Sequence, residues 1–268
     1  MDNRSIGVFD SGLGGLSVMR HLIERFPNEN FVYFGDTARL PYGTRSEDTI
    51  LKYVKSDMAF IDTFHVKMVI VACGTASSVA LPRMQKRPYP VYGVVQVSAD
   101  AAVQATKNKR IGVIATETTI KSASFEKRIE DDDRSVSVFP VACPLLVPLV
   151  ENGCIDDELA MLGVEKYLSQ LRDKDIDTLI LGCTHYPLLR NVIQKAAGSG
   201  VKLIDPGEET ARFVARVLSG GEVEPAEKRC GKHQYFVSDS VYNFSAMGSL
   251  FLGKDITKQV KKIDIERY

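Results

Sequence analysis

The sequence predicts an α/β fold of two pseudo-symmetric lobes with mainly parallel sheets and a ligand site in the cleft between them. Short apolar runs alternate with amphipathic stretches along the whole 268-residue chain. The apolar runs are almost continuously hydrophobic, as strands are when helices cover both faces of a parallel sheet. In addition, VIVACGTA at 69–76 is similar to LILGCTHY at 179–186, and IGVFDS at 6–11 to IGVIAT at 111–116. Two copies of one strand–turn–helix pattern indicate two similar lobes.

Buried strands are predicted wherever a short, continuously apolar run ends in small or polar residues. In chain order these runs are 6–9, 30–35, 68–73, 90–95, 110–115, 136–141, 178–183 and 201–205, and 233–243 is predicted as one more strand. The amphipathic stretches between them predict helices at 15–26, 46–64, 98–107, 121–130, 156–172 and 208–218. Pro27 is expected to end the first helix, and Ser46, followed by two acidic residues, to start the second.

The order of these elements predicts how the two lobes divide the chain. Residues 1–97 plus 208–268 are expected to form the first lobe, which carries Asp10 and Cys73. Residues 98–207 are expected to form the second lobe, which carries Glu151, Cys183 and His185. The C-terminal segment is therefore predicted to return to the first lobe.

Composition and charge exclude several functional classes. The 34 Lys and Arg residues balance 34 Asp and Glu residues, so no electrostatic attraction to nucleic acid is predicted. The longest apolar stretch, VACPLLVPLV at 141–150, is about half of a membrane span and contains two prolines, so no membrane partner is predicted. The N-terminal residues lack the pattern of a signal peptide, and we expect a cytoplasmic protein.

The five cysteines show no CxxC spacing, so neither a disulfide framework nor a structural zinc site is predicted. Cys143, Cys154 and Cys230 are interpreted as small, inert, buried side chains. Cys73 and Cys183 differ from these three because each ends a predicted strand, just before a turn and a helix. A Cys183–His185 metal site lacks recognisable further ligands, so no metal is predicted.

Polar groups gather where the predicted parallel strands end, which is where such sheets bind ligands. Asp10 and Ser11 open the turn DSGLGG, which is not GxGxxG and has no Walker lysine, so a nucleotide is not favoured. Cys73 and Cys183 would each lie at a helix start, where a thiolate is stabilised. His185 can hold or shuttle the proton of Cys183, and Asp10 can serve Cys73 in the same way.

Two thiols on opposite walls of one cleft are what a racemisation requires. One removes a proton from a carbon, and the other returns a proton to the opposite face. Without an electron-sink cofactor, aimed dipoles and exclusion of water must stabilise the carbanion, and hydroxyls such as Ser11, Thr75 and Thr184 are suitable donors. Two alternatives remain open from the residues alone: buried cysteines without a chemical role, and a thiol hydrolase that uses one Cys–His pair.

Five motifs carry a family resemblance: IGVFDSGLGGLSV, GDTARLPYG, ACGTAS, PLLVPLVENG and GCTHYPLL. In this order they resemble the glutamate racemases of the cofactor-independent aspartate/glutamate racemase superfamily, from about residue 5 to about residue 215. The resemblance implies that Cys73 and Cys183 are the catalytic acid/bases, with Asp10, Glu151 and His185 assisting. The substrate residues that it implies are Asp10, Ser11, Tyr42, Gly43, Gly74, Thr75, Thr116, Thr119, Thr184 and His185.

The resemblance also implies a biological role and partners. The substrate would be glutamate, the product D-glutamate for peptidoglycan synthesis, the cofactor none, and the assembly a homodimer. One residue departs from the family pattern, because Gly74 stands where an Asn usually follows the first catalytic Cys. The lost amide predicts weaker binding or altered specificity, at about 1.5–3 kcal/mol for one hydrogen bond to a charged group. An aspartate racemase and a catalytically weakened amino-acid-binding or inhibitory relative therefore remain as alternatives.

Overall fold

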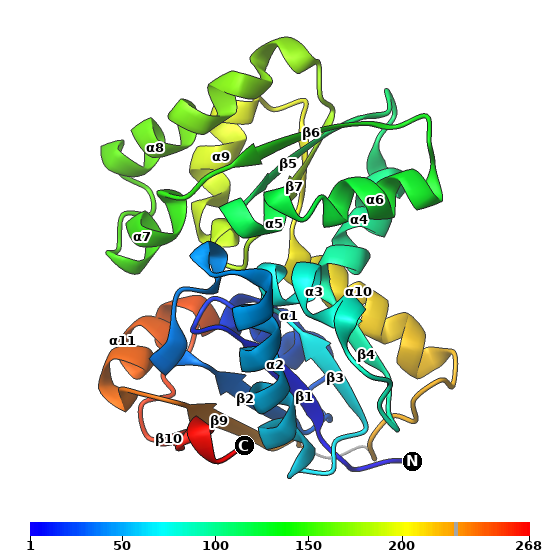
Figure 1. Ribbon diagram of the computed structural model, residues 1–268, viewed down its shortest axis with the longest axis vertical. Helices are drawn as coiled ribbons and strands as arrows, with labels where there is room; N and C mark the ends of the chain where they lie inside the picture. Colours follow the sequence, from blue (N-terminus) through cyan, green and yellow to red (C-terminus); the bar gives the residue numbers. More distant parts are fainter. Residues whose placement is uncertain (228–229) are drawn as a thin grey trace.

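The computed structural model describes residues 1–227 and 230–268 and contains two α/β lobes stacked on each other (Figure 1). The first lobe is built on a six-stranded parallel sheet in the order β10-β9-β2-β1-β3-β4. Its strands are β1 (Ile6–Asp10), β2 (Phe31–Gly35), β3 (Met68–Val71), β4 (Val91–Gly93), β9 (His233–Val237) and β10 (Val260–Lys262). The strands from the C-terminal segment extend the sheet beyond β2.

The second lobe is built on a four-stranded parallel sheet in the order β6-β5-β7-β8. Its strands are β5 (Arg110–Ala115), β6 (Ser137–Ala142), β7 (Thr178–Leu181) and β8 (Lys202–Ile204). This order matches β2-β1-β3-β4 of the first sheet, so β1 corresponds to β5 and β3 to β7. The predicted fold class, two similar lobes with parallel sheets, is confirmed.

Helices cover both faces of each sheet (Figure 1). Those that pack on the first sheet or join the lobes are α1 (Leu16–Arg25), α2 (Glu47–Asp62), α3 (Gly74–Val79), α4 (Val94–Ala105), α10 (Pro206–Ser219) and α11 (Val241–Leu252). Those of the second lobe are α5 (Glu117–Lys121), α6 (Ser124–Asp132), α7 (Leu146–Glu151), α8 (Glu158–Leu168) and α9 (Arg190–Ala197). Among the described residues, no helix is long and apolar enough to cross a membrane.

The hydrophobic core explains why the strands are apolar throughout. Successive strand residues point to opposite faces of a sheet, so both faces need apolar side chains. Val8 packs in the cluster that contains Leu16 of α1, whereas its neighbour Phe9 packs with Met58 of α2. The sequence signal for a doubly covered sheet therefore corresponds to two separate cores.

The chain passes between the lobes through α4 and α10, which contact each other. The predicted boundaries at 97/98 and 207/208 fall inside these two helices, and as exact limits they stay a prediction. The segment after α10 does return to the first sheet, as β9 and β10. Residues 228–229 of the predicted first lobe lie outside the described residues.

Two predicted strands include residues that are helical in the structure. The strand predicted at 90–95 stops at Gly93, and α4 begins at Val94. The strand predicted at 233–243 stops at Val237, and α11 begins at Val241. In α11 the buried residues Phe244, Phe251 and Leu252 recur at helical spacing, and this period of three to four residues outweighs the apolar composition that suggested a strand.

Candidate active site

One cavity of about 250 Å³ lies between the lobes, at the carboxyl ends of equivalent strands of the two sheets. Ser11 follows β1, Cys73 follows β3, Thr116 follows β5 and Cys183 follows β7. The predicted site residues that line the cavity are Ser11, Tyr42, Gly43, Cys73, Gly74, Thr75, Thr116, Glu151, Cys183, Thr184 and His185. The volume is below the roughly 300–1,000 Å³ of pockets for drug-sized ligands, so the cavity fits a small molecule.

Cys73 occupies the N-cap position of α3. Its Sγ accepts a hydrogen bond from the backbone N–H of Ala76 at 3.4 Å and lies 3.5 Å from Oγ of Ser11. The side chain is almost fully buried. Burial, and then the nearby charge of Asp10, raises the pKa of Cys73 to about 12. At neutral pH this thiol therefore holds its proton and is suited to donate one.

Cys183 faces an imidazole that is held from behind by a carboxylate. Nδ1 of His185 lies 3.8 Å from Sγ of Cys183, and Nε2 lies 3.0 Å from Oε1 of Glu151. Burial alone would lower the pKa of His185, but hydrogen bonds with Cys183 and Glu151 outweigh it and raise the pKa to about 10. The imidazole therefore carries a positive charge at neutral pH, and an imidazolium is a favourable neighbour for a thiolate.

Asp10 lies behind the cavity lining and links the two lobes. Its Oδ2 accepts the backbone N–H of Gly12 at 2.9 Å, and its Oδ1 accepts the hydroxyl of Thr184 at 3.4 Å. Burial raises the pKa of Asp10, and the charge of His185 opposes that shift. The carboxyl thus fixes the turn after β1, and it also interacts with the backbone of Gly15, the residue that precedes α1.

Three threonine hydroxyls meet across the cleft. Oγ1 of Thr75 lies 3.0 Å from Oγ1 of Thr116 and 3.3 Å from Oγ1 of Thr119, and the last two are 2.9 Å apart. Thr75 belongs to the first lobe and the other two to the second, so the cluster joins the lobes. Thr119 itself lies behind Thr116 and does not line the cavity.

Tyr42 lines the cavity, but its hydroxyl points away from it. That hydroxyl contacts Oδ2 of Asp36 at 2.5 Å and Oδ2 of Asp57 at 2.9 Å. Arg39 pairs with the same two carboxylates, at 2.6 and 2.7 Å. These four residues form a buried network beneath the loop 40–44, so the Tyr42 ring and not its hydroxyl is available to a ligand.

Several lining residues were not singled out by the sequence analysis. They are Leu40, Pro41, Thr44, Glu117, Cys143, Pro144, Val147, Pro148 and Gly182. The motifs GDTARLPYG and PLLVPLVENG contain most of them, and these motifs were the available signal. Cys143 is buried as expected but also lines the cavity.

The prediction of buried side chains is wrong for two of the other cysteines. Cys154 is half-buried, in the loop after α7, and Cys230 is exposed, in the loop before β9. Loops run over the surface, and neither residue belongs to a strand or helix that would hold it inside. Among the described residues, no group of three or more His, Cys, Asp or Glu side chains could hold a metal ion.

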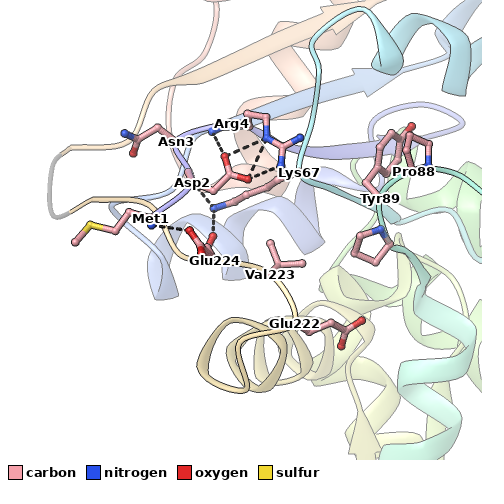
Figure 2. A pocket seen from close by; sticks show the side chains of 11 residues that line it. Met1, Asp2, Asn3, Arg4, Lys67, Pro88, Tyr89, Glu222, Val223 and Glu224 are labelled. Carbon is pink, nitrogen blue, oxygen red and sulfur yellow. Dashed lines mark hydrogen bonds and ion pairs between the residues drawn. The ribbon is translucent and has the colours of Figure 1, made fainter.

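A second, more open hollow of about 760 Å³ lies beside the N-terminal residues (Figure 2). Its described lining residues include neither Cys nor His. Charged groups in it pair with one another, Arg4 with Asp2 and the amino group of Met1 with Glu224 (Figure 2). Beneath it, Lys67 pairs with Glu29. This chemistry holds the N-terminal segment in place, whereas the reactive groups are in the inter-lobe cavity.

Known proteins are similar to this chain in both sequence and fold. The family model for Asp/Glu/Hydantoin racemase matches residues 6–214. The glutamate racemase of Geobacter metallireducens is 47% identical over 251 residues, which cover 93% of both chains. The crystal structure of the Francisella tularensis glutamate racemase in complex with D-glutamate has a TM-score of 0.92, 34% identity and full coverage of both chains. A Bacillus anthracis glutamate racemase isoform has a TM-score of 0.94, 39% identity and 98% coverage of both. On this agreement of sequence and fold, the chain belongs to the Asp/Glu/hydantoin racemase family.

Proposed function

We propose that this protein is a glutamate racemase that interconverts L- and D-glutamate without a cofactor, by proton transfer between two thiols. The observation that carries the proposal is the placement of Cys73 and Cys183 after equivalent strands of opposite lobes, on the lining of one cavity. The named activity of the relatives supports glutamate as the substrate. A hydrolase with one Cys–His pair would leave Cys73 without a role.

The proposed reaction moves one proton off the α-carbon and another on. One sulfur, as a thiolate, takes the α-proton and becomes a thiol, and the electron pair stays on the α-carbon. The other sulfur, as a thiol, gives its proton to the opposite face of that carbon and becomes a thiolate. Each turnover therefore inverts the carbon and exchanges the protonation states of the two cysteines.

The electrostatics of the two cavity walls support proton transfer between the two thiols. The high pKa of Cys73, about 12, keeps a proton on that wall. The imidazolium of His185 provides a positive charge beside Cys183 on the other wall. The two walls thus differ, with a thiol that keeps its proton on one and a positive charge on the other.

The carbanion needs stabilisation, because the α-proton of an amino acid is a very weak acid. The hydroxyls of Ser11, Thr75, Thr116 and Thr184 line the cavity and can donate hydrogen bonds to the substrate carboxylates. Donors that are already in place in a small, water-poor site stabilise developing charge more strongly than water does. The threonine hydroxyls at the cleft are donors of this kind, because contacts with one another hold them in place.

The wider role follows from the product. D-glutamate made by such an enzyme would supply peptidoglycan synthesis, which is the role we propose. The homodimer that the sequence resemblance implies remains a prediction, and sedimentation equilibrium of the purified chain measures it directly.

The function is tested with the purified protein and three assays. Circular dichroism with L-glutamate and with L-aspartate reads racemisation and specificity, and deuterium uptake from D₂O at the α-carbon reads proton exchange. We expect turnover of glutamate that far exceeds that of aspartate, with deuterium incorporated. Cys73→Ser and Cys183→Ser should each reduce racemisation by at least about 10²-fold, whereas Cys230→Ser, at an exposed position, should not. Normal rates in both active-site variants would refute the proposal.

A further inference from the structure

Gly74 is the first residue of α3 and touches the other lobe through its backbone. A Cβ at this position would lie 2.4 Å from the carbonyl oxygen of Gly182, which is closer than real Cβ contacts come. Gly74 lies on the first lobe and Gly182 on the second, at the end of β7. The missing side chain therefore allows a backbone-to-backbone contact between the lobes at the cavity.

Neither partner in this contact can move easily within its own lobe. The N–H of Gly182 donates to the carbonyl of Ile114 at 2.7 Å, which ties it to the second sheet. The carbonyl of Gly74 accepts the hydroxyl of Ser78 at 2.8 Å, inside α3. A side chain at residue 74 would thus be accommodated by moving one lobe relative to the other, because each lobe is closely packed.

The position of the contact links it to both thiols. Gly74 follows Cys73 directly and Gly182 precedes Cys183 directly. Any separation of the lobes at this point therefore also separates the two sulfur atoms, and catalysis is sensitive to such changes. A misplacement of about 1 Å can cost about 10²-fold in rate.

Two other glycines of the first lobe face the second lobe, but against side chains. A Cβ on Gly14 would meet the side chains of Thr184 and His185, and one on Gly43 would meet the side chain of Thr116. Among these three glycines, Gly74 is the one whose contact is with backbone, so a change of side-chain rotamer in the other lobe cannot relieve it.

We infer that Gly74 is a positioning residue whose missing side chain sets the closeness of the two lobes and so the gap between the two thiols. The effect that we expect on the rate rests on the proposed racemase function. The inference also explains in physical terms what Gly changes at a position where the family usually has Asn. This chain lacks the side-chain amide of Asn but has a narrower cleft between the lobes. Restoring Asn would push the lobes apart.

The kinetic test compares Gly74→Ala, Gly74→Ser and Gly74→Asn with the wild type and with Gly200→Ala. Nothing among the described residues lies within 4 Å of a Cβ at Gly200, so that variant controls for a Gly-to-Ala change alone. We expect kcat to fall roughly 10- to 100-fold in all three Gly74 variants, equally from L- and D-glutamate. KM should change less than about threefold, because the substrate groups in the lining remain.

Stability and structure provide readouts that do not depend on activity. Because each lobe stays intact, the thermal midpoint of Gly74→Ala should remain near that of the wild type. A crystal structure of Gly74→Ala should show both lobes unchanged internally but farther apart at residues 74 and 182.

Three outcomes would overturn the inference. They are an unchanged kcat in Gly74→Ala, a kcat/KM above wild type in Gly74→Asn, and a variant whose lobe unfolds or distorts to absorb the clash. A wild type with no glutamate racemase activity would instead refute the proposed function, while the crystal structure would still decide the steric claim.

Discussion

Nε2 of His185 lies 3.0 Å from Oε1 of Glu151, and this pair forms one wall of the inter-lobe cavity. The carboxylate comes from the last residue of α7, and the imidazole from the turn after β7. On its other side the ring faces Cys183. The carboxylate therefore orients the imidazole and supports its charge, as acidic partners do for catalytic histidines.

Replacing Glu151 by Gln should weaken this support. The pKa of His185 should fall, because a charged acceptor is lost, and the positive charge beside Cys183 should be lost at lower pH. We expect kcat/KM to drop at least roughly tenfold at pH 8 and the alkaline limb of the rate profile to move to lower pH. The pH dependence of kcat/KM between pH 6 and 10 measures both. An unchanged alkaline limb would mean that Glu151 does not act through the imidazole.

The same pair predicts how stability depends on pH. The pKa of His185 is about 10 in the folded protein and 6.5 as an ordinary value, so the folded state binds the proton more tightly. This contribution is complete below about pH 6.5 and is lost as pH rises to about 10, and it amounts to at most roughly 5 kcal/mol. Urea unfolding of the wild type and His185→Asn should show a gap between their free energies of unfolding, and this gap should narrow as the pH rises over this range. A gap that is constant or grows with pH would contradict the raised pKa.

The sequence alone could predict the strand-end residues because chain order determines them. Parallel strands place every residue that follows a strand at the same edge of its sheet, so Ser11, Cys73, Thr116 and Cys183 converge once the lobes face each other. The direction of a side chain is a different matter. Tyr42 lines the cavity, yet its hydroxyl turns to Asp36 and Asp57, and a local pattern such as LPYG does not contain those partners.

Contacts between distant segments could not be predicted from the sequence either. The clash that a Cβ on Gly74 would have with Gly182 depends on how closely the lobes pack, which no motif specifies. The predicted strand 233–243 includes the first three residues of α11, and the helical period of its buried residues lies beyond that range. Local patterns thus predicted most strands and the residues at their ends, whereas packing between the lobes decided the details.

His233 should make the protein less stable in mild acid. Its Nδ1 is buried and has no hydrogen-bond partner among the described residues. Burial, and then the charge of Lys254, lowers its pKa to about 4. Between pH 6.5 and 4 the unfolded chain therefore binds a proton that the folded chain does not, and stability falls as the pH falls. Urea unfolding at pH 7, 6, 5 and 4.5 should show a shallower decline for His233→Gln than for the wild type. Parallel curves for the two proteins would argue against this source of acid sensitivity.

Two substitutions in the buried network under the loop 40–44 should lower the free energy of unfolding by very different amounts. One removes the cation of the network and the other removes a carboxyl. Arg39 is the single guanidinium between Asp36 and Asp57, whose side chains are fully buried. Burial, and then the negative charge of Asp36, raises the pKa of Asp57 well above its usual range. Two buried carboxyls share this one cation, so the charge of Asp57 is less well compensated than that of a one-to-one ion pair.

Asp57→Asn should therefore cost less free energy of unfolding than Arg39→Met, because it removes a carboxyl whose charged form burial and Asp36 already disfavour. Arg39→Met should cost about 3–5 kcal/mol, because it leaves a buried carboxylate without its cation. Arg39→Met should also raise KM for glutamate, since the loop 40–44 lines the cavity. Urea unfolding and steady-state kinetics of the two variants measure these effects. Equal destabilisation by both substitutions would show that Asp57 is ionised and that the network is a balanced set of charges.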